Sequence, residues 1–395
     1  MDSKIKLFNS KIFILLILIP FFEPEYISVG YYGVHKIINY WKLFASMIIV
    51  FLYFKQMKIS KFILTIMIYE FIIIGATYLN RYGYVRLALN TGLDIISICM
   101  FLELGIKNNC KKMIHTILLI FEVLVYSNLI TLIIYPDGMY ISNRQNYANN
   151  WLLGYDNLHI VTILPAIVIS LIYSYIDGEK IKFRTKILLI CGLTSVFITL
   201  SATSTVAILI LIIFIMQKNS VFKNTIVFNY LNYCLTYIVL FISIVLLRLQ
   251  EIFSWFIVDI LGKSLTFTGR TNIWDATMYY IKESWIWGYG VEKSLIRTLK
   301  NSNQYATHAH NHILEVLYKG GILLLFAFLY LLLIVGRKLM KYKGTMISKI
   351  LSFSIFLFFL MMLVEARDTM NLYILLIFSY YVDKIVDITD IDKKE

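Results

Sequence analysis

The chain is built as a series of apolar runs separated by short polar segments. Most runs are about 20 residues long, the length that an α-helix needs to cross the hydrocarbon core of a bilayer. The hydropathy pattern predicts about twelve spans: 12–24, 37–54, 61–79, 85–105, 113–135, 157–176, 186–200, 203–217, 228–249, 311–335, 350–365 and 370–385. We therefore expect an all-α, polytopic integral membrane protein.

Composition agrees with this pattern. Of the 395 residues, 59% are hydrophobic and only 15% are charged, whereas soluble proteins keep about a quarter of their residues charged. The net charge of +13 does not indicate a nucleic-acid partner, because the cations come in small groups between apolar runs. That distribution is typical of membrane topology rather than of a nucleic-acid-binding face.

The placement of lysine and arginine predicts the orientation. Basic residues gather in alternate polar segments, for example at Lys107–Lys112 and Arg337–Lys349, and are scarce in the segments between them. The positive-inside rule then places both termini in the cytoplasm and the chain in the cell membrane. The apolar N-terminal run contains Pro20 and lacks a small-residue cleavage site, so we expect an uncleaved first span.

This orientation divides the chain into three parts. Residues 1–249 form an N-terminal membrane bundle of about nine spans, 250–310 a long external loop, and 311–395 about three further spans. The loop is the one segment long enough to fold over the membrane, so we expect the catalytic loop and its amphipathic helices there. The four cysteines lie in or beside the spans without metal-ligand spacing, so we expect neither a disulfide nor a cysteine metal site.

Three histidines stand at alternate positions where the loop meets the tenth span: His308, His310 and His312. Asn311 suits the N-cap of the span, and Glu315 suits its first turn, spaced i, i+4 from Lys319. A capped helix with interfacial histidines would explain these residues without chemistry. A helix N-terminus beside a histidine can also bind an anion and supply a base near neutral pH. Zinc is disfavoured, because the three positions diverge on a helix.

Two other external stretches carry polar groups. Residues 267–290 predict an amphipathic surface helix, introduced by Arg270, whose guanidinium suits bidentate phosphate binding, and ended at Gly288. Before the sixth span, Arg144, Asp156 and Asn157 lie at the predicted membrane surface. A solvated loop is the default interpretation of each of these last three residues.

Taken together, these blocks resemble the O-antigen ligase/polymerase family of polytopic membrane glycosyltransferases. The resemblance rests on the order and spacing of short motifs across about 55 residues of the external loop. They are Gly269-Arg270, Trp274, Trp287-Gly288-Tyr289-Gly290, His310-Asn311, Leu314-Glu315 and Gly320-Gly321. Arg144, Gly154 and Asn157 add weaker support. The Ser-Arg pair that often opens a later span in the family is missing from Ser201–Thr205.

The resemblance implies transfer of a glycan from a polyprenyl diphosphate to an acceptor sugar hydroxyl outside the cytoplasmic membrane. It implies His310 as the base and Arg270, Arg144 and Asn311 as groups for the diphosphate. Gly288, Gly290, Asn157 and Glu315 would support the site, with neither metal nor cofactor. A polymerase for capsule, exopolysaccharide or O-antigen is favoured, with membrane lipid, a flippase and a chain-length regulator as partners. A ligase acting on a lipid core is the nearest alternative, then a lipid-linked oligosaccharide flippase or a structural scaffold.

Overall fold

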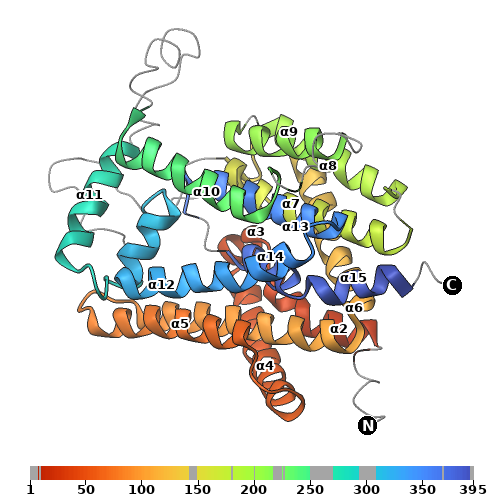
Figure 1. Ribbon diagram of the computed structural model, residues 1–395, viewed down its shortest axis with the longest axis horizontal. Coiled ribbons are helices and arrows are strands. Elements are labelled where there is room, and N and C mark those ends of the chain that lie inside the picture. Colours follow the sequence, from red (N-terminus) through yellow and green to blue (C-terminus); the bar gives the residue numbers. More distant parts are fainter. Residues whose placement is uncertain are drawn as a thin grey trace, which may run out of the picture.

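The computed structural model is a bundle of helices in which long helices lie side by side (Figure 1). It describes residues 8, 10–141, 149–178, 181–199, 201–216, 225, 227–249, 270–292, 308–366 and 369–391. Five of the described helices are long and apolar enough to cross a membrane, which confirms the all-α, polytopic membrane fold. The bounds of the helices follow the apolar runs of the sequence closely.

The N-terminal part contains most of the long helices. Its elements are α2 (Lys11–Leu18), η1 (Ile19–Phe22), α3 (Glu25–Gly30), α4 (Tyr32–Gln56), α5 (Lys61–Leu79) and α6 (Val85–Ile134). Serine hydroxyls cap two of the starts, since Ser10 accepts from the Phe13 N–H and Ser60 from the Ile63 N–H. The backbone leaves helical geometry at Asn109, so α6 is two helices joined at a kink. They correspond to the predicted fourth and fifth spans.

A small antiparallel sheet precedes the next helix. Its strands are β1 (Tyr140–Ile141), β2 (Asn149–Trp151) and β3 (Gly154–Tyr155), with Tyr140 opposite Asn150 and Trp151 opposite Gly154. The Trp151 indole N–H donates to the Tyr135 carbonyl at 2.7 Å, which fixes the sheet to the end of α6. The helical pattern did not predict these strands, because they occupy only a few residues of a predicted loop.

The middle of the chain continues as α7 (Asp156–Ile176), α8 (Phe183–Thr199), α9 (Ala202–Met216), α10 (Tyr230–Leu240) and η3 (Phe241–Leu246). The predicted division between the seventh and eighth spans is confirmed, because α8 ends just before Ser201 and α9 begins just after it. There the Ser201 hydroxyl donates to the Ser204 hydroxyl at 2.9 Å.

The last elements are α11 (Arg270–Glu283), α12 (His312–Lys341), α13 (Met346–Met362), α14 (Met370–Tyr380) and α15 (Val382–Ile391). Helix α12 is interrupted at Gly320 and Gly321, where the backbone leaves helical geometry. Helix α12 packs along α5 and against α14 (Figure 1). One continuous apolar core contains side chains from both the N-terminal and the C-terminal helices, so the two predicted membrane parts pack as one body.

Candidate active site

The start of α11, the start of α12 and the segment after α13 meet around the carboxylate of Glu365. The Arg270 guanidinium donates to one of its oxygens through Nη2. On the other oxygen, His310 Nδ1 lies at 3.3 Å and His308 Nε2 at 3.7 Å. The Glu365 side chain is 3% exposed, while those of Arg270 and His310 are 20% and 23% exposed. A buried anion thus connects an arginine and two histidines that reach the surface.

The contacts of the two imidazoles favour particular tautomers. The His310 backbone N–H donates to His308 Nδ1 at 3.2 Å, so His308 carries its proton on Nε2, facing the carboxylate. His310 Nδ1 faces the Glu365 carboxylate at 3.3 Å without forming a hydrogen bond to it. The negative charge there favours the tautomer with its proton on Nδ1, and in that tautomer the lone pair is on Nε2, the nitrogen that a general base would use.

The backbone at His310 adopts an unusual conformation. Its φ of +48° lies in the left-handed region, which costs a non-glycine residue about 1–2 kcal/mol. The surroundings hold it there, because the His310 carbonyl accepts from the Trp274 indole N–H at 3.4 Å and the next residue is the N-cap of α12. Backbone strain of this kind is concentrated at functional sites. The tryptophan therefore positions the histidine rather than only anchoring α11.

Asn311 is the N-cap of α12, as predicted. Its side-chain oxygen accepts from the Leu314 N–H at 3.1 Å, and its amide nitrogen donates to the Leu363 carbonyl at 3.0 Å. The second bond ties the start of α12 to the segment that carries Glu365. Both ends of this fully buried amide contact protein groups, so Asn311 serves the site by ordering the helix terminus.

Glu315 fixes the residues that precede α12. Its Oε2 accepts from the Ala309 N–H at 2.7 Å, and its Oε1 pairs with Lys319 Nζ at 3.2 Å. The predicted i, i+4 ion pair is confirmed. Since Ala309 lies between two of the histidines, this carboxylate holds the loop in the conformation that directs both imidazoles toward Glu365.

The segment after α11 docks on the break in α12. The Tyr289 N–H donates to the Tyr318 carbonyl at 2.7 Å, and the Gly290 N–H donates to the Lys319 carbonyl at 2.8 Å. In return, the Ile322 N–H donates to the Trp285 carbonyl at 2.8 Å. These bonds satisfy backbone groups that a break in a membrane helix would otherwise expose.

Glycine is required where the backbone of the segment after α11 contacts the backbones of α12 and α5. Gly288 and Gly290 have φ values of +65° and +70°. An added Cβ at Gly288 would lie 2.4 Å from the Tyr318 carbonyl oxygen, and one at Gly290 would lie 2.3 Å from the Thr77 backbone. Helix α11 ends at Glu283, before Gly288, and hydrogen-bonded turns follow it. The motif glycines therefore permit docking on α12 and α5 rather than capping α11.

The remaining predicted site residues lie elsewhere. The Asn157 side chain accepts from the Ser201 hydroxyl, between α7 and α9. His312 is buried and packs edge-on against Phe328, with ring centroids 5.0 Å apart. Arg144 lies outside the described residues. Of the predicted residues, His310, Arg270, Asn311 and Glu315 are thus brought to one place.

Sequence reasoning missed two residues of this region. Glu365 is the last residue of the eleventh predicted span and belongs to no motif of the external loop. Arg248, just after η3, donates to the Thr271 carbonyl at 3.2 Å and to the Asp275 carboxylate. It places a second guanidinium beside the start of α11. A carboxylate at an otherwise apolar helix end is the one signal that could have indicated Glu365.

His308, His310 and Glu365 also have the donor atoms of a metal site. One atom from each lies within 4.8 Å of the others, and two imidazoles with a carboxylate are ligands that zinc accepts. Arg270 shares the same carboxylate, and its fixed positive charge opposes a divalent cation there. The geometry therefore suits a histidine beside the Arg270–Glu365 ion pair better than it suits a bound metal.

Comparison with known proteins finds one family model that matches part of the chain. Residues 187–329 match the model of the O-antigen ligase family, a segment that extends from α8 into α12 and includes Arg270 and His310. This supports the O-antigen ligase/polymerase family that the loop motifs indicated. No curated protein matches the chain, and no solved structure matches it. The chain is an integral membrane protein with a segment that is similar to the O-antigen ligase family, and Glu365 lies beyond that segment.

Proposed function

We propose that this protein polymerises lipid-linked oligosaccharide repeat units on the outer face of the cytoplasmic membrane. The observation that carries the proposal is the Glu365 carboxylate, which contacts Arg270 at the start of α11 and faces His310 just before α12. A hydroxyl nucleophile needs a base, and a diphosphate leaving group needs a positive charge. The two groups stand together there.

The proposed reaction is a displacement at the anomeric carbon of the donor glycan. The acceptor hydroxyl oxygen forms the new glycosidic bond while its proton passes to His310 Nε2. The bond between the anomeric carbon and the diphosphate oxygen breaks, and the electron pair leaves with the polyprenyl diphosphate. Glu365 stabilises the imidazolium that forms, because its carboxylate faces Nδ1.

Arg270 is proposed to bind the diphosphate. One of its nitrogens contacts Glu365, and a guanidinium has further donors for phosphate oxygens. The N-terminus of α12, capped by Asn311, adds the positive end of a helix dipole. Arg144 is proposed to assist from the segment before α7. No step in this scheme uses a metal or a cofactor.

A ligase is the second candidate, because the matching family model bears that description. Both activities use the same donor and the same chemistry, and they differ in the acceptor. A flippase would need charged groups along an intramembrane cavity, whereas Arg270 and His310 gather at the ends of helices. A flippase and a chain-length regulator are proposed as partners of the polymerase.

The experiment that tests the proposal is the His310→Ala variant in a strain that lacks the native gene. Loss of a general base costs about 10²–10⁴ in rate, so we expect polymer to disappear while the protein level stays normal. The matched control is His115→Ala, because His115 Nε2 lies 3.2 Å from Arg184 Nη1 and Arg184 donates to Glu122, so the same three residue types come together there. The lipid carrier is then analysed for the glycan that accumulates.

Single repeat units on the outer leaflet are the expected result. Long chains on the lipid carrier would identify a ligase instead. Units confined to the inner leaflet, or normal polymer from His310→Ala, would contradict the transferase assignment.

A further inference from the structure

Arg248, two residues after the end of η3, has a rare backbone conformation. Its φ of +53° lies in the left-handed region, and among the described residues only Arg248 and His310 are non-glycine residues with a positive φ. The residues that lead to it, Phe241–Leu246, form a π-helical turn, which is frequent at functional sites. Strain of this kind persists only where the surroundings hold it. The conformation that marks the proposed base thus marks one arginine as well.

The end of η3 packs against the elements that position His310. Val245 is fully buried in a small apolar cluster with Trp274 of α11 and with Ala309, just before α12. Trp274 is the residue whose indole N–H donates to the His310 carbonyl. Because Arg248 follows Val245 by three residues, it lies at the same junction of α11 and α12.

Two guanidinium groups therefore border the first turn of α11. Arg270 is the first residue of that helix, and Arg248 Nη2 donates to the carbonyl of the next residue, Thr271, at 3.2 Å. The same nitrogen donates to the Asp275 carboxylate, one turn further along α11. A guanidinium has five N–H donors, and Arg248 uses neither Nε nor Nη1 in these two bonds.

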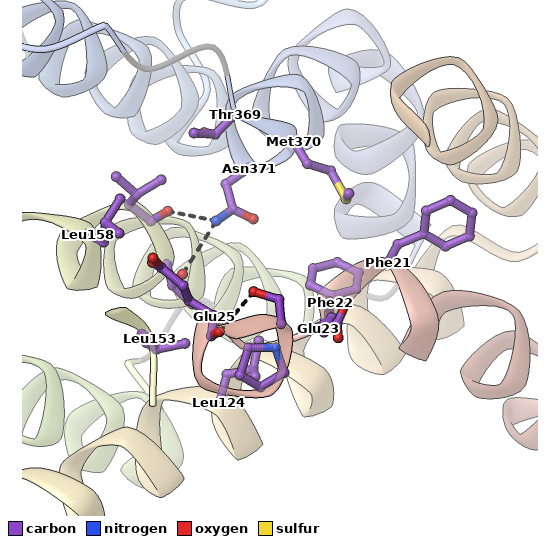
Figure 2. Close-up of a pocket in the computed structure, with 14 residues that line it drawn as sticks. Phe21, Phe22, Glu23, Glu25, Leu124, Leu153, Leu158, Thr369, Met370 and Asn371 are labelled. Atoms are coloured by element: carbon purple, nitrogen blue, oxygen red, sulfur yellow. Dashed lines mark hydrogen bonds between the residues drawn. The ribbon is translucent and has the colours of Figure 1, made fainter. Parts of the chain in front are cut away.

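The acidic partner of Arg248 is exposed, unlike those of the other arginines. Three ion pairs between an arginine and a carboxylate are found in the described part of the chain, and in two of them the carboxylates, Glu122 and Glu365, are buried. The Glu23 carboxylate at the wall of the cavity in Figure 2 also faces a basic side chain and is 7% exposed. Asp275 is 59% exposed, although Arg248 is only 23% exposed.

This difference makes the Arg248 pair the one that can be exchanged. An ion pair with an exposed carboxylate contributes little to stability. The Asp275 carboxylate can therefore leave Arg248 for water at a small cost in free energy, and another anion can take its place.

A diphosphate is the anion that suits this exchange. It carries more negative charge than one carboxylate, and its oxygens match the planar fork of a guanidinium. Arg270 donates to the buried Glu365 carboxylate, which compensates part of its charge and opposes the approach of a second anion. A second guanidinium beside the same helix turn supplies charge that Glu365 does not compensate.

Resting on the proposed function, we propose that Arg248 binds the donor diphosphate together with Arg270 and releases Asp275 as it does so. Arg248 belongs to none of the motifs on which the family resemblance rests. It follows the ninth predicted span almost directly, whereas Arg270 lies at the far end of the long loop. The fold brings the two arginines together at the start of α11.

The test must separate ligand binding from a structural role, in which Arg248 would only hold α11 through Thr271 and Asp275. The probe is inorganic diphosphate, and its binding to the purified full-length protein in detergent is measured by calorimetry at constant ionic strength. Arg248→Gln should weaken binding about ten- to a hundredfold, because a hydrogen bond between charged groups is lost. Arg248→Lys should lose less, because it keeps the charge without the fork.

The matched control is Asp275→Asn. It breaks the same ion pair but leaves the guanidinium in place, so we expect this variant to bind diphosphate at least as tightly as the unaltered protein. Equal weakening in Arg248→Gln and Asp275→Asn would show that the ion pair only orients α11, and the inference would be wrong. Unchanged binding by Arg248→Gln, or no binding by the unaltered protein, also overturns it.

Two further measurements keep the test decisive. Thermal unfolding in detergent shows whether each variant is folded. If Arg248→Gln is not, unchanged binding by Arg248→Lys or weaker binding by Asp275→Asn overturns the inference. Sulfate that binds the unaltered protein as tightly as diphosphate does would identify a non-specific anion site and would also overturn it.

The His310→Ala experiment separates this inference from the proposed function. Lost polymer in His310→Ala with unchanged diphosphate binding in Arg248→Gln leaves the transferase standing and removes the Arg248 contact. Weakened binding in Arg248→Gln together with normal polymer from His310→Ala leaves a diphosphate site and removes the proposed reaction.

Discussion

Among the residues that the structure describes, an arginine, a glutamate and a histidine come together in two places, and the carboxylate has a different position in each. The Glu365 cluster consists of Arg270, Glu365 and His310. The Glu122 cluster consists of Arg184, Glu122 and His115. In the first cluster the carboxylate is central, with the arginine on one oxygen and the histidine facing the other. In the second the arginine is central.

The bonding of Arg184 explains the second arrangement. Its Nε and Nη2 donate to the two oxygens of Glu122, and its Nη1 lies 3.2 Å from His115 Nε2. The Arg184 guanidinium thus lies between the carboxylate and the imidazole, whereas in the Glu365 cluster the carboxylate lies between the guanidinium and the imidazole. The same three residue types therefore place a cation beside His115 and an anion beside His310.

The largest effect we expect concerns the side of the membrane that each loop faces. Cation placement predicts that the loop between α11 and α12 is external and that the turn between α12 and α13 is cytoplasmic. An impermeant thiol reagent on intact cells should label Lys300→Cys and leave Lys343→Cys unlabelled until the membrane is opened. The reverse pattern would place the Glu365 cluster inside the cell and end the comparison.

Replacing the glutamate of each cluster should have the next largest effect, and the effect should differ between the two clusters. Glu365→Gln should lower turnover per folded protein by about 10²–10⁴, because the base loses its anion. Glu122→Gln should instead lower the protein level, since it breaks a partly buried ion pair and leaves Arg184 without its anion, and should leave turnover unchanged. Polymer yield divided by protein in the membrane measures both. Equal loss of turnover in the two variants would show that neither glutamate is specific to the reaction.

Lysine in place of each arginine should have a smaller effect. Arg270→Lys keeps the charge but loses the bidentate fork, so we expect turnover to fall by about ten- to a hundredfold. Arg184→Lys should reduce stability alone. Thermal unfolding in detergent and polymer synthesis separate the two effects, and normal synthesis by Arg270→Lys would argue against a diphosphate contact.

The smallest effect is expected at His308. Its ring is farther from Glu365 than that of His310, so His308→Gln should change turnover by only a few-fold, about 1 kcal/mol or less. Chelators should likewise leave activity intact. A large loss of activity with either treatment, restored by added zinc, would indicate that His308, His310 and Glu365 bind a metal and that His310 is not a general base.

Local signals in the sequence explain what could be predicted. The helices follow from apolar runs, and the N-cap at Asn311 and the ion pair of Glu315 with Lys319 follow from spacing within one turn. Glu365 could not be found in this way, because its partners lie in other segments of the chain. The docking of the segment after α11 on the break at Gly320 and Gly321 could not be predicted either. Contacts between backbones require glycines but have no other pattern in the sequence. The strands before α7 were too short to give a pattern.

The docking of the Trp285–Gly290 segment has a consequence for how the protein is made. The segment and the residue after it contact α5 and its C-cap through Thr77 and Asn80, and the segment contacts α12 through the carbonyls of its broken turn. Helix α12 leaves the ribosome long after α5, so the segment can form all of these contacts only when both helices are in the membrane. Glu365 is synthesised later still. The proposed active site is therefore incomplete until the segment after α13 has been made, and a shorter nascent chain should be inactive.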